Sequence, residues 1–175
     1  STVWLYGDQF DSTMNYTFTN ICKDFFAYKK IPVSLFDARI QKMNHRYPRP
    51  VSLAQMNFLD THDVGRFLSF CDEDIATYKL AVAFLISAQG IPSVFYGDEK
   101  GMTGIEETDY RRPMPWDKNS ELESYFKEWI SLRRNSKALN MGTYVTELVD
   151  DENRVYAFSR CFEAQKITVV INAGQ

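Results

Sequence analysis

The sequence predicts an α/β fold in which parallel strands alternate with helices, followed by a small antiparallel β-domain. Two apolar runs, at 56–63 and 91–99, both end in carboxylates. Segments with helical patterning surround these runs, at 18–26, 35–43, 74–88 and 120–132. From Gly142 onward the pattern changes to short β-branched runs separated by turn residues. The alternation favours a parallel sheet or barrel over residues 1–140, and the change in pattern places a second domain at 141–175.

The composition argues against several classes of function. The chain has 175 residues, of which 45% are hydrophobic, enough for one domain or for parts of two. A net charge of −3 and the lack of a Lys/Arg block leave no basic field for nucleic acid. The apolar stretch at 80–88 is too short to span a membrane. Cys22, Cys71 and Cys161 lack the spacing of a zinc site or a disulfide framework. We therefore expect no nucleic-acid or membrane partner, no metal, no cofactor, and a cytoplasmic location.

The first part of the chain is expected to contain a short strand at 12–16 and two helices. One face of the first helix carries an apolar stripe that predicts core packing, formed by Phe18, Ile21, Cys22, Phe25 and Phe26. Ser34 can cap the second helix. The inward side of that helix is predicted to consist of Leu35, Ala38, Ile40 and Met43. The proline-rich segment 47–50 should end it.

The strand predicted at 56–59 ends abruptly in polar residues, Asp60, Thr61, His62 and Asp63. Its apolar residues suit a parallel strand that is covered on both faces. In a β/α barrel, the carboxyl end of such a strand carries the chemistry. We therefore expect the active site of this protein to lie where residues 60–63 leave the strand.

The helix at 74–88 should begin at the acidic triplet 72–74, because carboxylates are stabilising at the positive end of the helix dipole. It is apolar nearly all round, so we expect it between the sheet and another layer. Ser120 should open the next helix. The buried side of that helix is predicted to be Leu122, Tyr125, Phe126, Trp129, Ile130 and Leu132. Strands of the second domain are predicted at 143–148, 155–161 and 167–172.

Two motifs, Phe58-Leu59-Asp60-Thr61-His62-Asp63 and Gly90-Ile91-Pro92-Ser93-Val94-Phe95-Tyr96-Gly97-Asp98-Glu99, resemble the last two barrel strands of the α-amylase family of glycoside hydrolases. The loop from Gly97 to Trp116 resembles that of its neopullulanase, cyclomaltodextrinase and maltogenic amylase subgroup. This resemblance implies the C-terminal portion of a (β/α)8 TIM barrel, about strands 6–8, at 1–140. The start of an antiparallel β-sandwich domain would follow at 141–175.

The resemblance also implies retaining hydrolysis of α-1,4-glucosidic bonds in cyclomaltodextrins, pullulan or maltodextrins. In such enzymes one carboxylate acts as nucleophile and a second as acid/base. Both would precede Ser1 in a longer protein, so we expect the isolated chain to be inactive. Transglycosylation by the same residues is one alternative, and a non-catalytic glycan-binding or scaffold barrel is another. Three of eight barrel strands would leave open sheet edges, so we also expect a homo-oligomer.

By the same resemblance, Asp63 is the catalytic carboxylate that stabilises the transition state, and His62 binds the same sugar. The competing interpretation of Asp63 is a helix N-cap or a salt bridge to Arg66. Glu107 and Arg111 match an acid and an arginine that contact substrate, although Asp109 could take the role of the acid. A solvated acidic loop paired to arginine is an equally plausible interpretation of this segment.

Aromatic rings can cover the C–H groups on the face of a sugar, so Tyr96 and Trp116 are predicted to bind substrate by stacking. Buried packing is the more common role of a tyrosine in a strand. Asp98 and Glu99 are expected to close the mouth of the barrel through hydrogen bonds. His45 is expected to be structural.

Overall fold

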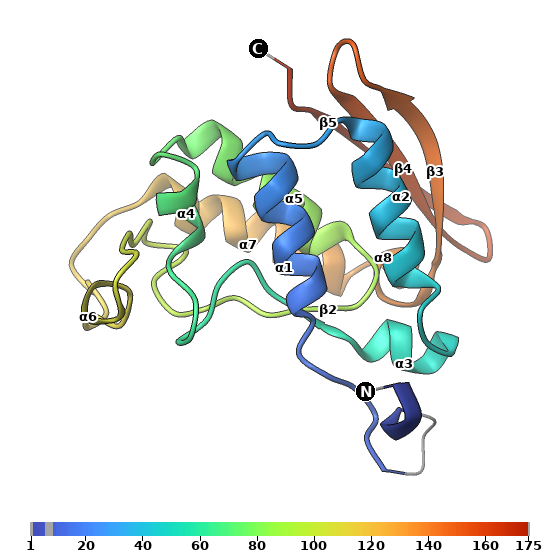
Figure 1. Cartoon of the computed structure of the whole chain (residues 1–175), viewed down its shortest axis with the longest axis horizontal. Helices are drawn as coiled ribbons and strands as arrows, with labels where there is room; N and C mark the ends of the chain where they lie inside the picture. Colours follow the sequence, from blue (N-terminus) through green and yellow to red (C-terminus); the bar gives the residue numbers. More distant parts are fainter. Residues whose placement is uncertain (1, 6–8, 175) are drawn as a thin grey trace.

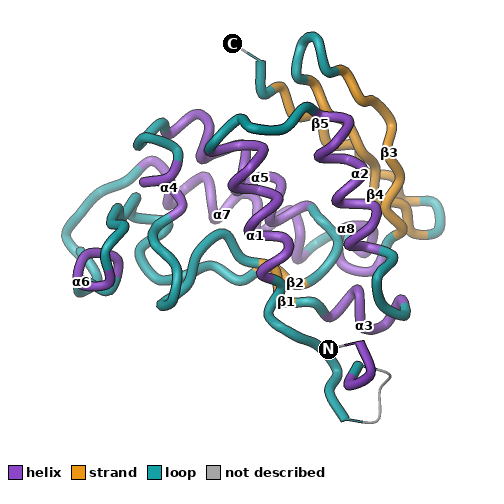
Figure 2. Tube along the Cα trace, in the orientation of Figure 1, coloured by secondary structure: helices purple, strands orange, loops and turns teal. Residues whose placement is uncertain are grey.

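The structure of the protein is a computed structural model that describes residues 2–5 and 9–174. Its helices form the body of the molecule, and a three-stranded sheet covers one end of that body (Figure 1). Two very short parallel strands lie below the helices, separate from that sheet (Figure 2). In the described part of the chain, no helix has the length and apolar character needed to cross a bilayer.

The parallel strands are β1 (Met56–Asn57) and β2 (Ile91–Pro92), which pair Met56 with Ile91. A parallel bridge from Met14 to Met56 adds a third segment on the other side of β1. The parallel arrangement expected from the sequence is confirmed, but the regular pairing is shorter than the predicted strands. Gly90 has a φ of +111°, and a Cβ there would lie 2.6 Å from the Asn57 amide nitrogen. A glycine at this position therefore lets β2 approach β1 closely.

The helices that precede β1 follow the predicted order, except that one additional helix is present and the inward side of another differs from the prediction. They are α1 (Tyr16–Cys22), continued by the π-helical η2 (Lys23–Ala27), then α2 (Val33–Asn44) and α3 (Arg49–Ala54). The pattern did not predict α3, which starts after Pro48 and carries a proline in its first turn, where a missing N–H costs nothing. The inward side of α2 is Val33, Phe36 and Ile40, while Leu35 and Ala38 are exposed, so those two predictions were wrong.

The later helices are α4 (Phe67–Phe70), α5 (Ile75–Ser87), α6 (Glu107–Tyr110), α7 (Glu121–Arg134) and α8 (Lys137–Met141). The helix α5 begins at the predicted acidic triplet, but through a cap, in which Asp74 accepts from the Ala76 N–H at 2.9 Å, and its first turn contains no carboxylate. Ser120 caps α7, as the sequence predicted. On α7, Leu122 and Phe126 are buried. The predicted Ile130 and Leu132 are exposed instead, because nothing described in the chain covers that side of the helix.

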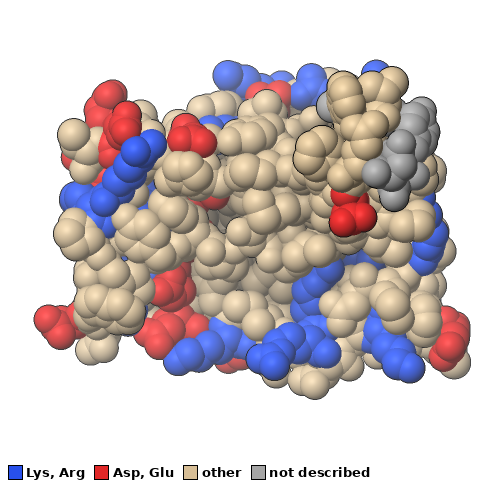
Figure 3. Space-filling view, turned by 90° about the horizontal axis from the view of Figure 1, so that it is seen from below, with Lys and Arg blue, Asp and Glu red and all other residues tan. Residues whose placement is uncertain are grey.

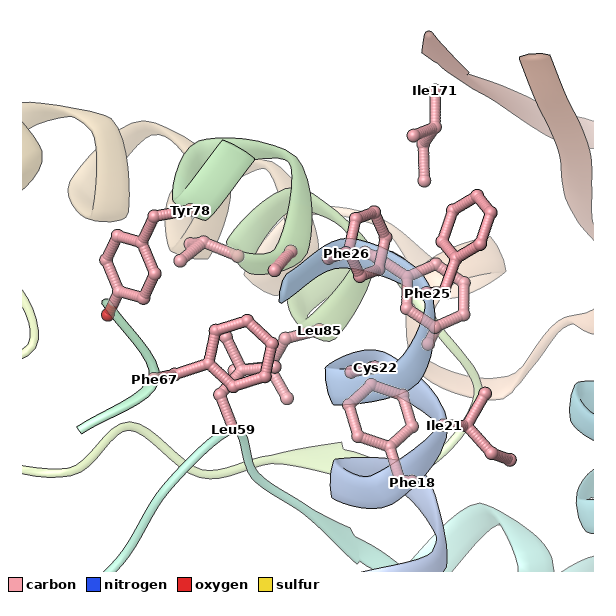
Figure 4. Packing of buried hydrophobic residues seen from close by; sticks show 14 of the residues in the cluster. Phe18, Ile21, Cys22, Phe25, Phe26, Leu59, Phe67, Tyr78, Leu85 and Ile171 are labelled. Atoms are coloured by element: carbon pink, nitrogen blue, oxygen red, sulfur yellow. The ribbon is translucent and has the colours of Figure 1, made fainter. Parts of the chain in front are cut away.

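The second sheet consists of β3 (Thr143–Asp150), β4 (Val155–Phe162) and β5 (Gln165–Asn172), antiparallel in that order. All three predicted strands are confirmed. The sheet packs on the helices through one aromatic core in which Phe36 lies 4.1 Å from Phe25, 5.1 Å from Phe84 and 5.3 Å from Tyr156 between ring centroids. Figure 4 shows another part of the same core, in which Phe25 and Phe26 of η2 lie close together and Ile171 of β5 lies nearby.

Polar contacts also join the sheet to the helices. The Asp151 carboxylate, in the β3–β4 turn, accepts from the Ser34 N–H at 2.8 Å and the Ser34 hydroxyl at 2.7 Å. The side chain expected to cap α2 is therefore itself bound by a carboxylate from the other end of the chain. The buried Arg160 of β4 donates to the Ser87 carbonyl at 2.9 Å and the Gly142 carbonyl at 3.1 Å.

Candidate active site

The chain turns sharply where it leaves β1. The Asp63 N–H donates to the Thr61 hydroxyl at 3.1 Å, and the Val64 N–H donates to the Thr61 carbonyl at 3.2 Å. This turn projects His62 and Asp63 outward, whereas Asp60, three residues after the end of β1, points inward and is buried. Polar residues that follow one another in sequence are thus divided between the interior and the surface.

Asp63 lies at the centre of a cluster that contains four of the predicted site residues. Its two oxygens are 3.3 Å from His62 Nε2 and 3.5 Å from Arg111 Nη2. Arg111 also pairs with Glu107 at 2.7 Å and donates from Nε to the His62 carbonyl at 2.7 Å. Neither competing interpretation of Asp63 fits, because Asp63 caps no described helix and its arginine partner is Arg111 rather than Arg66. Glu107, not Asp109, is the acid that pairs with Arg111.

The cluster is open to solvent. The side chains of His62, Asp63, Arg111 and Glu107 are 63%, 53%, 42% and 65% exposed. Ion pairs with this exposure contribute between zero and about 1 kcal/mol to stability. The cluster therefore does little to hold the fold together, and its acceptors and donors are accessible to a polar ligand.

Beneath the cluster, a fully buried arginine connects the segments that carry it. Arg66 donates to the Tyr96 carbonyl at 2.7 Å, the Tyr110 carbonyl at 3.1 Å and the Asp98 carboxylate at 3.2 Å. Its guanidinium lies over the ring of Phe95, 4.2 Å from the centroid. Asp98 thus makes one of the expected hydrogen bonds at the strand end. No local pattern predicted that Arg66 is buried, because an arginine after a turn is usually a surface residue.

Two carboxyl groups share this buried layer with Arg66. Burial raises the pKa of Asp60 to about 6. Burial, and then the charge of Asp60, raises the pKa of Asp98 well above its usual range. Asp60 accepts from the Phe67 N–H at 2.6 Å through one oxygen, and its other oxygen has no partner in the described chain.

The structure does not bring the two predicted stacking residues to Asp63. Tyr96 is partly exposed and donates its hydroxyl to the Arg112 carbonyl at 2.7 Å. Trp116 is 77% exposed and lies at a separate cavity of about 420 Å³, which it shares with Met114, Phe126 and Ile130. His45, at the end of α2, has its Nδ1 2.8 Å from the Gln41 carbonyl.

The described residues contain no group of three or more His, Cys, Asp or Glu side chains placed to hold a metal ion. The face of the molecule seen from below in Figure 3 is mostly uncharged near its centre, and most of its lysines and arginines lie towards its margins. The candidate active site is the charged cluster around Asp63, because contacts there join four of the predicted site residues.

Comparison with known proteins gives a consistent result. The sequence matches the family described as alpha amylase, catalytic domain, over residues 1–173. It is 40% identical to a cyclomaltodextrinase of Thermoanaerobacter pseudethanolicus over 97% of this chain and 30% of that protein. It is also 40% identical to neopullulanase 2 of Thermoactinomyces vulgaris, over 97% of this chain and 29% of that protein.

Solved structures agree with the sequence matches. A cyclomaltodextrinase structure superposes with a TM-score of 0.93 at 36% identity, covering 98% of this chain and 30% of that one. A cyclic α-maltosyl-(1→6)-maltose hydrolase from Arthrobacter globiformis gives a TM-score of 0.91 at 29% identity, covering 98% and 39%. The chain thus spans about a third of the length of these relatives.

Fold and site together define a portion of a β/α-barrel enzyme with its polar cluster where a parallel strand ends. The chain belongs to the α-amylase family of glycoside hydrolases. It has the fold of the C-terminal part of that catalytic barrel, followed by an antiparallel sheet.

Proposed function

We propose that this chain is the part of an α-glucan hydrolase that grips the sugar at the bond being cleaved. The bonds would be the α-1,4-glucosidic bonds of cyclomaltodextrins, pullulan or maltodextrins. The observation that carries the proposal is the Asp63 carboxylate, which is held between His62 and Arg111 at the end of β1 and yet remains open to solvent. Relatives named cyclomaltodextrinase and neopullulanase support this substrate class.

Asp63 would act by accepting hydrogen bonds from two hydroxyl groups of the sugar. Sugar hydroxyls both donate and accept, so the imidazole of His62 and the guanidinium of Arg111 supply the donors that Asp63 lacks. Hydrogen bonds of this kind that strengthen as the ring flattens towards the oxocarbenium-like transition state can supply several kcal/mol. Glu107 would keep Arg111 oriented through their contact at 2.7 Å.

We assign the nucleophile and the acid/base to a part of the protein outside these 175 residues. The proposal therefore predicts binding without turnover for the chain alone. Transglycosylation would use the same cluster, since it differs only in whether water or a sugar attacks the intermediate. A glycan-binding protein without catalysis would also use this cluster, and it is the second candidate function because the site is accessible.

The test measures two quantities for the chain and its Asp63→Asn variant. The first is reducing sugar released from β-cyclodextrin and from pullulan, and the second is the affinity for β-cyclodextrin by titration calorimetry. We expect no release from either protein and an affinity at least about tenfold lower in the variant, the loss of roughly one strong hydrogen bond. Glu128→Gln, on the exposed side of α7, is the matched control.

Other results of these two measurements would refute parts of the proposal or distinguish between the candidate functions. Sugar release that disappears in Asp63→Asn would place the catalytic carboxylates inside this chain and refute the assignment. Equal affinity of the chain and both variants would remove Asp63 from the binding site. Release by a longer protein, lost in its Asp63→Asn variant, would favour the hydrolase over the glycan-binding candidate.

We also propose that the chain forms a homo-oligomer. Apolar side chains on the parallel segments are exposed, including Met14, Ile91 and Val94, and exposed apolar area of this kind favours association. Light scattering over a dilution series tests this, and a single monomeric mass at every concentration would refute it.

A cytoplasmic location is supported by a 30% identical relative named intracellular maltogenic amylase in Bacillus subtilis strain 168.

A further inference from the structure

Two chain segments must stay aligned for the Asp63–Arg111 contact of 3.5 Å to exist. One segment leaves β1 and carries His62 and Asp63, and the other is α6 with the residue after it, Arg111. The ion pairs between them are too exposed to fix this alignment. The buried layer beneath must therefore hold it.

Arg66 is placed to hold both segments. It follows Asp63 by one short turn, and its own N–H donates to the Gly104 carbonyl at 2.8 Å. Its guanidinium donates to the carbonyl of Tyr110, the residue before Arg111, at 3.1 Å. A single buried residue of the segment that carries Asp63 thus bonds the backbone of the segment that carries Arg111, through both its N–H and its side chain.

We propose that Arg66 is a positioning residue for the Asp63–Arg111 cluster, and that Asp60 and Asp98 hold its guanidinium by carrying one shared proton between them. This inference rests on the function proposed above. It goes beyond it by assigning a role to three buried residues that do not reach the substrate.

The shared proton follows from the charge and the hydrogen bonds of the layer. Two ionised carboxylates with one guanidinium would leave a net negative charge in the interior, which is costly. A proton on Asp98 removes that charge and provides a donor to its neighbour Asp60, one of whose buried oxygens otherwise lacks a partner. One negative charge then faces the one positive charge of Arg66.

The groups around the pair are consistent with this charge count. Lys23, from η2, lies near Asp60 but is only half-buried, and its Nζ sits over the Phe70 ring, 3.8 Å from the centroid; no ion pair joins it to Asp60 in the described chain. Tyr78, from α5, lies near both carboxyl groups, and burial raises its pKa, so it is neutral. Arg66 is therefore the fully buried cation of the layer, as the ion pair of 3.2 Å to Asp98 shows.

The first experiment uses the histidine beside Asp63 as a reporter. The chain has two histidines, and His45 lies outside the site, so its Cε1–H resonance is an internal control. In Arg66→Lys, which keeps the charge but loses the planar fork, we expect the His62 resonance to shift and β-cyclodextrin affinity to fall about tenfold. The His45 resonance and the far-UV circular dichroism should not change.

An unchanged His62 resonance in folded Arg66→Lys would overturn the positioning role. The His62 resonance is measured without ligand, so this result remains valid even if the wild-type chain does not bind β-cyclodextrin. A wild-type chain that does not bind β-cyclodextrin would count against the proposed function alone. A shifted His62 resonance with unchanged β-cyclodextrin affinity, in a wild type that binds, would also overturn the role.

The second experiment tests the shared proton. It does not depend on Arg66→Lys, so the proposal can be tested even if that variant does not fold. Asp60→Asn and Asp98→Asn each leave one carboxylate opposite Arg66, so we expect both to keep the wild-type His62 resonance. The double variant leaves the guanidinium without a counter-charge, and its denaturant midpoint should fall well below that of either single variant. An infrared carboxylic-acid band present at pH 7 and lost in Asp98→Asn would identify the proton. Absence of that band, or a double variant as stable as the singles, would overturn the proposal.

Discussion

Phe36 is the residue whose truncation should best show whether the helices and the antiparallel sheet unfold together. It lies on α2, is fully buried, and contacts rings from three other parts of the chain: Phe25 in η2, Phe84 in α5 and Tyr156 in β4. In Phe36→Ala these rings lose a common neighbour. The change therefore weakens the helical part and its attachment to the sheet at once.

The expected loss of unfolding free energy is about 3–5 kcal/mol, the usual cost of Phe→Ala in a core. The upper part of that range applies here. Phe36 is enclosed on several sides, and ring pairs in such geometry add roughly 0.5–1.5 kcal/mol beyond their buried area. With a urea dependence of about 2 kcal/mol per molar, the midpoint should fall by roughly 2 M.

Urea unfolding monitored by tryptophan fluorescence and by far-UV circular dichroism provides the measurement. The tryptophans lie in the first 140 residues, whereas circular dichroism also reports the sheet, so coincident transitions indicate one cooperative unit. Leu35→Ala, at the neighbouring exposed position, is the control and should cost no more than about 0.5 kcal/mol. A loss in Phe36→Ala as small as in Leu35→Ala would refute the packing described here. Separate transitions would support two domains divided near residue 141.

Two further predictions concern the carboxylates. Because the pKa of Asp60 is raised to about 6 from a usual value near 4, its contribution to stability is fully present below about pH 4 and is lost as the pH rises through about 6. Relative to Asp60→Asn, which lacks the titrating carboxyl, the unfolding free energy of the wild type should fall by up to about 3 kcal/mol over this window, and parallel pH curves of the two proteins would contradict the shift. Asp74→Ala removes the α5 cap and its 2.6 Å bond from the Thr77 hydroxyl, so it should cost about 1 kcal/mol in thermal unfolding, against no change for Glu128→Ala. Equal melting temperatures of the two variants would argue against the cap.

Local chemistry was enough to predict most of the elements. Asp74 and Ser120 cap the helices that follow them because a capping side chain bonds backbone groups only a few residues away. The strands of the antiparallel sheet are set by β-branched runs and the turns between them. His62 and Asp63 were predicted as site residues from the resemblance of their motif, and the structure places both in the turn that follows β1.

The wrong predictions of burial and of side-chain contacts share one physical cause. Periodicity shows which residues lie on one face of a helix, but not whether another element covers that face. Leu35 and Leu132 are exposed for this reason. Ser34 is bound by Asp151, a partner that lies 117 residues away and is invisible to any local pattern.

Local sequence patterns were enough to predict the order of the elements and both kinds of sheet, and the resemblance of one motif singled out His62 and Asp63. Which charged residues are buried depends instead on contacts between distant segments. Arg133 illustrates this: it donates to the carbonyls of Ile86 and Ala88 at the end of α5, and burial lowers its pKa to about 10. Arg66 can likewise be buried because carbonyl groups and a carboxylate accept the hydrogen bonds of its guanidinium. A buried guanidinium needs several carbonyl or carboxylate acceptors around it, and only the folded chain brings together acceptors from segments so far apart in the sequence.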